Sequence, residues 1–182
     1  MNDIVLLLGD PGLRINCKPV EDISNNIFQK ENKQLKNRLD KFRKEKGFGR
    51  GIAAPQIGIK KRFIALNIGN GTQTLINPKI TWSGLDTFTL WDDCMSFPDL
   101  LIKVKRSQSI SISFYDENGT FKEWNHLDKI KSELLQHELD HLDGILAIDR
   151  AVNSEGIIYR TVYKQNREYF DKQVDYTIQA TI

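Results

Sequence analysis

The segment from Lys129 to Leu142 restricts the fold more than any other part of the chain. Its apolar side chains recur at helical spacing, and neither glycine nor proline interrupts them: Ile130, Leu134, Leu135, Leu139 and Leu142. This pattern predicts a helix with one buried face, because residues three and four apart lie on the same side. Gly144 follows as a candidate C-terminal cap.

Segments with a two-residue period precede this helix and predict β-strands. Residues 109–114 alternate most clearly, and a turn at 116–119 leads into a return strand at 120–124. Shorter strands are expected at 62–68, 72–76, 79–82 and 87–91, with Asn77-Pro78 ending the second of these. Strands followed by one late buried helix indicate an α+β fold, in which antiparallel β-sheets pack around that helix.

The two ends of the chain predict less. Apolar residues at helical spacing indicate an N-terminal helix over 22–46, capped by Asp22 or Ser24 and ended by the glycine-rich residues 47–51. The first ten residues predict an extended segment rather than a signal peptide, because no basic residue precedes their short apolar run. The tail from about residue 150 is ambiguous: its first part fits a helix, and residues 174–182 fit a terminal strand.

Composition excludes several classes of protein. The 182 residues are 40% hydrophobic and 27% charged, which suits a single folded domain over 1–182 and excludes a disordered chain. No apolar run is long enough to cross a membrane. A formal net charge of only +2 argues against direct DNA binding. With no export signal we expect a cytoplasmic protein, in which Cys17 and Cys94 form no disulfide.

Two histidines on the late helix are the strongest functional signal. In His137-Glu138-Leu139-Asp140-His141 the histidines are four residues apart, so both imidazoles lie on one helix face and can reach one ion. Glu138 follows the first histidine and can reach a water bound to that ion. The chain has only three histidines, so this pattern is specific. The sequence therefore predicts a catalytic metal site on this helix.

Spacing alone leaves the third metal ligand open. Metzincin-like proteases place a histidine six residues after the second one, where this chain has Ala147. Glu155 offers a downstream carboxylate of the thermolysin type. Cys94 is the stronger candidate, because it follows a predicted strand in a polar segment and a thiolate suits zinc or ferrous iron. For Cys17 we expect a buried apolar role.

Three motifs follow one another along the chain: Gly49-Arg50-Gly51-Ile52-Ala53-Ala54-Pro55-Gln56, Asp92-Asp93-Cys94-Met95-Ser96 and Gln136-His137-Glu138-Leu139-Asp140-His141. Together they resemble the motifs of the peptide deformylases, metallo-amidases that remove the formyl group from the N-terminal methionine of new bacterial proteins. The resemblance covers about residues 5–149 and leaves the tail outside.

The resemblance implies three metal ligands: Cys94, His137 and His141. Fe²⁺ is the ion it favours, and family members also accept Zn²⁺, Ni²⁺ or Co²⁺. It also implies that Glu138 acts as general base and then general acid. The Gln56 side-chain amide and the Met95 backbone N–H would donate hydrogen bonds to the oxyanion.

The resemblance further implies that the formylated peptide lies in strand-like fashion along four residues: Gly49, Arg50, Gly51 and Ile52. Arg50 stands where an apolar residue is usual in the family. Glu133 precedes His137 by one helical turn, in a region that lines the family's apolar methionine pocket. Two alternatives stay open. The two charged side chains either point to solvent or pair without effect, or they reshape the pocket against an apolar guest.

A second departure lies beside Cys94, where Asp92 and Asp93 replace the Glu-Gly of the family motif. In the family the acid at the first position pairs with an arginine, so we predict an Asp92–Arg106 ion pair that steadies the Cys94 loop. Asp93 would be strained if its position required a positive φ.

The sequence supports three functional hypotheses. The first is a deformylase that acts on N-formylated peptides or nascent chains, with transient ribosome contact. The second is an amidase of the same chemistry with a changed N-acyl or peptide specificity. The third is a paralogue that binds peptide termini with little turnover. The presence of Glu138 favours the first two, because a protein without turnover does not need a base beside the ligands.

Overall fold

The computed structural model describes residues 4–178, and within them the strands form two antiparallel sheets. The five-stranded sheet has the order β1-β2-β3-β6-β7, and the three-stranded sheet has the order β4-β5-β8. The bounds in the first sheet are β1 Gly51–Ala53, β2 Phe63–Leu66, β3 Gln73–Ser83, β6 Ile110–Tyr115 and β7 Phe121–Trp124. Those in the second are β4 Thr87–Asp92, β5 Leu100–Ser107 and β8 Ile157–Tyr159.

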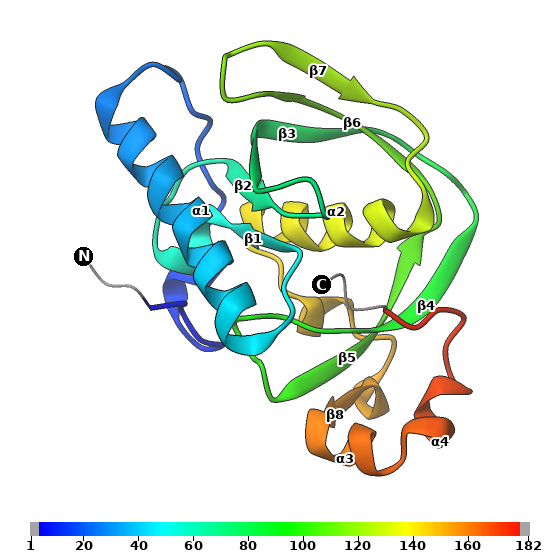
Figure 1. Ribbon diagram of the computed structural model, residues 1–182. Coiled ribbons are helices and arrows are strands. Elements are labelled where there is room, and N and C mark those ends of the chain that lie inside the picture. The colour runs from blue at the N-terminus through cyan, green and yellow to red at the C-terminus, as the bar shows by residue number, and fades with distance from the viewer. Residues whose placement is uncertain (1–3, 179–182) are drawn as a thin grey trace.

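Helix α2 lies in the middle of the molecule, between the two sheets (Figure 1). The α-helices are α1 Asn26–Lys46, α2 Lys129–Leu142, α3 Arg160–Gln165 and α4 Arg167–Asp171. Short 3₁₀ turns are η1 Pro11–Arg14, η2 Ala54–Ile57, η3 Ala147–Arg150 and η4 Ser154–Gly156. Among the described residues, no helix has both the length and the apolar character that crossing a membrane requires. The predicted α+β fold, with antiparallel sheets around the late helix, is confirmed.

The five-stranded sheet separates two apolar clusters, because alternate side chains of a strand point to opposite faces. On β2, Ile64 and Leu66 pack in the cluster that holds the apolar side chains of α2. Phe63 and Ala65 pack in the cluster that holds those of α1. Burial of each large apolar side chain stabilises the fold by about 1.5–3 kcal/mol. The two clusters thus hold α1 and α2 on opposite faces of this sheet.

A third apolar cluster packs the loop that contains Cys94 against the end of α2. It contains Leu90 of β4, Ile102 and Val104 of β5, and Leu146 just after α2. Cys94 belongs to the same cluster and is 5% exposed. The three-stranded sheet therefore presents the loop after β4 to the histidine face of α2.

The predicted bounds of α2 are confirmed. Asp128 caps its start by accepting a hydrogen bond from the Lys131 N–H at 2.9 Å. Gly144 has a φ of 73° one residue beyond the C-cap residue Asp143. Helix α1 begins later than predicted. Asn25 is its N-cap residue, whereas Asp22 bonds the N–H and hydroxyl of Ser24 in a turn before it.

The strand prediction is wrong in two respects: the end of β3, and the omission of β1 and β5. Strand β3 continues through Asn77-Pro78, where the prediction ended it. Trp82, near the end of β3, is 44% exposed, with its ring against His126 at a centroid distance of 4.7 Å. β5 and β1 were not predicted as strands.

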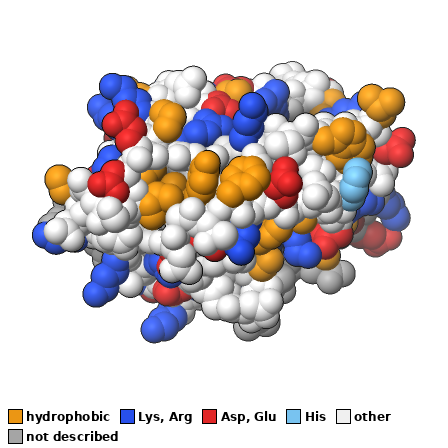
Figure 2. All heavy atoms as spheres, turned by 90° about the horizontal axis from the view of Figure 1, so that it is seen from above, with side chains coloured by type: hydrophobic (Ala, Val, Ile, Leu, Met, Phe, Trp, Pro, Cys, Tyr) orange, Lys and Arg blue, Asp and Glu red, His pale blue; other side chains and the backbone are white. Residues whose placement is uncertain are grey.

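The first part of the tail contains helix, as its sequence pattern indicated, in α3 and α4. Of the strand expected over 174–182, the described part holds an isolated bridge between Tyr176 and Leu90, and residues 179–182 lie outside the described residues. Basic, acidic and hydrophobic side chains are interspersed on the face shown in Figure 2, in keeping with the low net charge.

Candidate metal centre and substrate cleft

Cys94, His137 and His141 meet at one buried point between the second sheet and α2. The distance between His137 Nε2 and His141 Nε2 is 3.2 Å, and Cys94 Sγ lies 3.2 Å from His141 Nε2. All three ligand atoms lie within 4.8 Å of one another. Two ligand atoms on a tetrahedral zinc ion, at bond lengths of about 2.0–2.3 Å, are separated by about 3.3–3.5 Å. The three side chains therefore fit a divalent metal ion.

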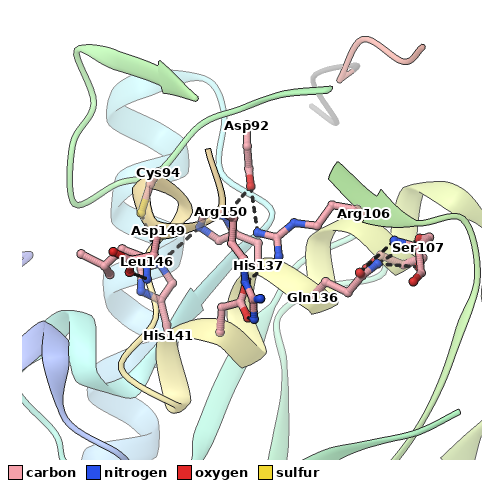
Figure 3. Close-up of polar contacts among 12 residues, drawn as sticks. Asp92, Cys94, Arg106, Ser107, Gln136, His137, His141, Leu146, Asp149 and Arg150 are labelled. Carbon is pink, nitrogen blue, oxygen red and sulfur yellow. Dashed lines mark hydrogen bonds and ion pairs between the residues drawn. The ribbon is translucent and has the colours of Figure 1, made fainter. Parts of the chain in front are cut away.

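The orientation of His137 also suits a metal ligand. Its Nδ1 lies 3.0 Å from Asp92 Oδ2, so the carboxylate accepts the Nδ1–H and Nε2 faces His141 (Figure 3). Metal-ligating histidines commonly hold their second nitrogen in this way. Burial, and then the neighbouring His137, lower the pKa of His141 well below its ordinary value. A neutral imidazole is the form that binds a metal.

The predicted ion pair between Asp92 and Arg106 is present, and it belongs to a larger network. Arg106 Nη2 lies 3.1 Å from Asp92 Oδ2, and Arg106 Nη1 donates to Asp140. Arg106 and Asp92 are both about 4% exposed at their side chains. Asp140 also pairs with Arg150 Nη2 at 2.8 Å. The guanidinium of Arg106 thus ties the end of β4, which precedes Cys94, to α2, which carries both histidines.

Glu138 is buried beside these three side chains. Its Oε2 has no hydrogen-bond partner among the described residues, and burial raises the pKa of its carboxyl to about 7. Space for the carboxylate depends on Gly51, since a Cβ at that position would lie 2.6 Å from Glu138 Oε1. A carboxyl with a pKa near neutrality can both take and return a proton.

Gln56 and Met95 both lie next to Cys94, the first through its side chain and the second along the chain. Gln56 Oε1 accepts a hydrogen bond from the Ala53 N–H at 2.8 Å, which fixes the side-chain amide. Its Nε2 lies 3.2 Å from Ser96 Oγ and 3.5 Å from Cys94 Sγ. Met95 is 8% exposed, and a Cβ at Gly49 would come within 2.8 Å of its Cε. Both predicted oxyanion donors therefore line the same cleft.

This cleft has a volume of about 610 Å³ and is lined by two of the three proposed metal ligands, Cys94 and His137. Strand β1 forms one margin. It pairs with β2 and stands at the end of the strand order, so its other edge is available to an extended chain. Gly49, Arg50 and Gly51 line the cleft. The side chain of Ile52 packs instead in the cluster that holds α1, so only its backbone can contribute to binding.

Arg50 and Glu133 form an ion pair inside the cleft. The distance from Arg50 Nη1 to Glu133 Oε1 is 2.6 Å, with side-chain exposures of 9% and 2%. Burial raises the pKa of Glu133 to about 7, against the lowering effect of Arg50. Within the first alternative left by the sequence, solvent exposure is excluded and pairing without effect remains; the second alternative, a reshaped pocket, also stays open.

The tail supplies cleft residues that sequence analysis missed: Arg160, Tyr163, Lys164, Arg167, Tyr176, Thr177 and Ile178. Arg160 Nη2 pairs with Asp93 Oδ2 at 3.1 Å, and the Trp91 indole N–H donates to the Phe170 carbonyl at 3.0 Å. In the sequence, the aromatic residues of the tail were the only feature that pointed to packing against the rest of the domain. Asp93 does not have a positive φ, so its predicted strain is absent.

A buried cysteine and two histidines beside an unpartnered glutamate, in an open cleft of an α+β fold, define a metallohydrolase. The family model for polypeptide deformylase matches residues 2–156. The chain therefore belongs to the peptide deformylase family, and it is a metal-dependent hydrolase.

Individual relatives agree with this assignment. The chain is 32% identical over 156 residues to the peptide deformylase of Thermotoga maritima, covering 86% of this chain and 91% of that protein. The solved structure of a Thermotoga maritima peptide deformylase matches with a TM-score of 0.72 and 34% identity, over 82% of this chain and 97% of that one. A peptide deformylase from Synechococcus elongatus, solved in complex with actinonin, matches with a TM-score of 0.75 and 30% identity, over 92% and 84%.

Proposed function

We propose that this protein removes the formyl group from the N-terminal formyl-methionine of nascent proteins. The observation that carries the proposal is the convergence of Cys94, His137 and His141 beside Glu138, in a cleft bordered by the free edge of β1. The reaction is hydrolysis of an amide, in which water and the formamide give formate and a free amine. We assign it to one domain over residues 1–182, acting in the cytoplasm with transient contact to the ribosome.

The proposed metal ligands are Cys94, His137 and His141, and we propose Fe²⁺ as the native ion, with Zn²⁺, Ni²⁺ or Co²⁺ as substitutes. One thiolate and two imidazoles suit each of these borderline cations. Such an ion supplies a Lewis acid and lowers the pKa of water towards about 7. Asp92 and Arg106 keep His137 oriented for this role.

The remaining steps belong to the protein's own groups. The free edge of β1 binds the peptide backbone as an added strand, and Gly51 lets it approach closely. The Gln56 amide and the Met95 N–H donate hydrogen bonds to the oxygen of the formyl group as it gains negative charge. Glu138 takes the proton of the attacking water and delivers it to the nitrogen of the leaving amine.

The direct test measures formate release from a formyl-Met tripeptide by the metal-loaded protein and by Glu138→Ala. The wild-type protein should turn over, and the variant should retain its metal but lose about 10²–10⁴-fold in kcat/KM. Metal content is measured in parallel. If both proteins are equally inert on N-formyl and N-acetyl peptides, the proposed function is wrong.

The Arg50–Glu133 ion pair favours a second candidate, a hydrolase of the same chemistry that prefers a polar first residue. Two opposite charges that neutralise each other need not repel a methionine, but they leave less apolar surface for one. The test compares formyl-Met with formyl-Ser and formyl-Gln peptides, in the wild type and in the Arg50→Ile/Glu133→Leu double variant. A wild-type kcat/KM of about 10⁴–10⁶ M⁻¹s⁻¹ on formyl-Met would refute the changed specificity.

A further inference from the structure

A second cavity lies on the other side of α2 and has strongly basic walls. Its volume is about 410 Å³. Five cationic side chains line it, from segments far apart in the sequence: Arg62, Lys79, Lys105, Arg106 and Arg150. The acidic side chains that line it are Asp140 and Asp143. We refer to this cavity, defined by these seven residues, as the basic cavity.

The basic cavity is separate from the substrate cleft. On α2, Gln136, Leu139 and Asp140 line the basic cavity, whereas His137 and Glu138 line the cleft. Since consecutive residues of an α-helix are turned by about 100°, these two sets lie on different faces. A molecule in the basic cavity would not occupy the position of a peptide in the cleft.

The charges around the basic cavity are incompletely balanced. Arg62 pairs with Asp143, and Arg150 pairs with Asp140. Lys79 and Lys105 have no acidic partner among the residues that the structure describes. Cations gathered around a concave wall create a positive potential that attracts a counter-ion. The two lysines therefore leave about two positive charges to be matched.

Arg106 provides an independent indication of a missing acceptor. Its two terminal nitrogens bind Asp140 and Asp92, but its Nε is buried and has no hydrogen-bond partner among the described residues. Leaving a buried donor unsatisfied destabilises the folded state. Arg106 lines the basic cavity at 4% exposure, so this unsatisfied donor belongs to a side chain of the cavity wall.

We propose that the basic cavity binds a phosphate group. Inorganic phosphate carries several strong acceptor oxygens and a charge of about −1.5 to −2, which suits a cavity lined by two exposed, unpaired lysines and the guanidinium of Arg106. Free inorganic phosphate offers this chemistry in full, and a phosphodiester of RNA offers acceptor oxygens of the same kind with about one negative charge per linkage. The experiment below separates the two sources.

The test titrates inorganic phosphate into the metal-loaded protein and follows binding by calorimetry. The Lys79→Gln/Lys105→Gln variant should bind at least tenfold more weakly than the wild type. A matched control is Lys30→Gln/Lys33→Gln, which removes the same charge from α1, outside the cavity, and should bind as the wild type does. Equal affinity in all three proteins, or no binding to any of them, would overturn the proposal.

The second arm measures the fluorescence anisotropy of a short labelled single-stranded RNA with the same three proteins. If RNA binding is lost in the cavity variant alone and is competed by phosphate, the ligand is a phosphodiester. If phosphate binds and RNA does not, the ligand is free phosphate. Deformylation of a formyl-Met tripeptide should be unchanged in both variants, which separates this proposal from the proposed function.

Discussion

At the scale of single residues, Gly51 fixes where the proposed base can stand. It is not needed for backbone conformation, because its φ is not positive. It is needed for space, because any Cβ there would overlap the carboxylate of Glu138. The deformylase chemistry proposed for Glu138 therefore depends on the absence of one methyl group from the neighbouring strand.

Gly51→Ala should lower kcat/KM on a formyl-Met peptide by about 10²–10⁴-fold, because the displaced carboxylate no longer reaches the attacking water. The variant should keep its circular dichroism spectrum and its metal content. Gly84→Ala is the control, since its Cβ would come within 3.3 Å of the Ser109 carbonyl, away from the cleft. An unchanged kcat/KM for Gly51→Ala would show that Glu138 does not need this position.

Cys17 is expected to be an unreactive thiol. It is 5% exposed, and burial raises the pKa of its thiol to about 11. Near pH 8 only about one thiol in a thousand is ionised, and the thiolate is the reactive form. In a Cys94→Ser variant, DTNB should therefore label Cys17 at least a hundredfold more slowly in the native protein than in guanidinium chloride. Rapid labelling of the native protein would contradict its burial.

At the scale of secondary-structure elements, the conformation of Asn77 explains how strand β3 continues beyond Pro78. It adopts a φ of 51°, and its side chain bonds the Val20 N–H at 2.8 Å and the Val20 carbonyl at 2.9 Å. Asparagine tolerates this left-handed conformation better than most residues. The register of β3 against β6 shifts at this point, which lets the strand continue beyond the Asn-Pro pair.

Asn77→Ala should destabilise the protein by about 2–3 kcal/mol, because it removes two hydrogen bonds and forces alanine into a positive φ. Asn77→Gly loses the same hydrogen bonds without the conformational strain, so its loss should be about 1 kcal/mol smaller. Urea unfolding of the three proteins measures both differences. Equal losses in the two variants would show that the backbone conformation of Asn77 carries no cost.

Elements with a clear period could be predicted from sequence, and those whose pattern depends on tertiary partners could not. α2 and β6 carry unbroken apolar patterns, and α2 has its predicted bounds. β5 was missed because Arg106 is buried at a position where alternation expects an apolar residue. Only its partners Asp92 and Asp140, from β4 and α2, make that burial possible. β1 was missed because glycines at 49 and 51 resemble a loop, yet pairing with β2 holds it extended.

The candidate site was predictable for a different reason. Cys94, His137, Glu138 and His141 stand in ordered motifs, so residues far apart in sequence could be expected at one place. The double role of Arg106, bound to both Asp92 and Asp140, has no such signal. The contribution of the tail also has no motif that would predict it. The tail is held beside the cleft by the packing of Phe170 on Trp91 at a centroid distance of 5.5 Å.

At the scale of the whole molecule, the three proposed metal ligands come from two layers. Cys94 follows the three-stranded sheet, whereas His137 and His141 belong to α2, which packs on the five-stranded sheet. An ion bound by all three joins these layers in the folded state and has no such site in the unfolded chain. Metal binding should therefore stabilise the assembly of the two sheets as well as serve the reaction.

Removal of the metal should lower the melting temperature. At a free metal concentration of about 100 times the Kd, binding stabilises the folded state by about 2.7 kcal/mol. A chain of this size shifts its Tm by about 2–4 °C per kcal/mol, which gives about 5–11 °C on chelation. Differential scanning calorimetry before and after treatment with a chelator measures this shift, and added Zn²⁺ or Ni²⁺ should restore it. Cys94→Ser is the control, because with one ligand removed its Tm should respond much less to the chelator. Equal melting temperatures of the wild type with and without metal would mean that no ion links α2 to the Cys94 loop.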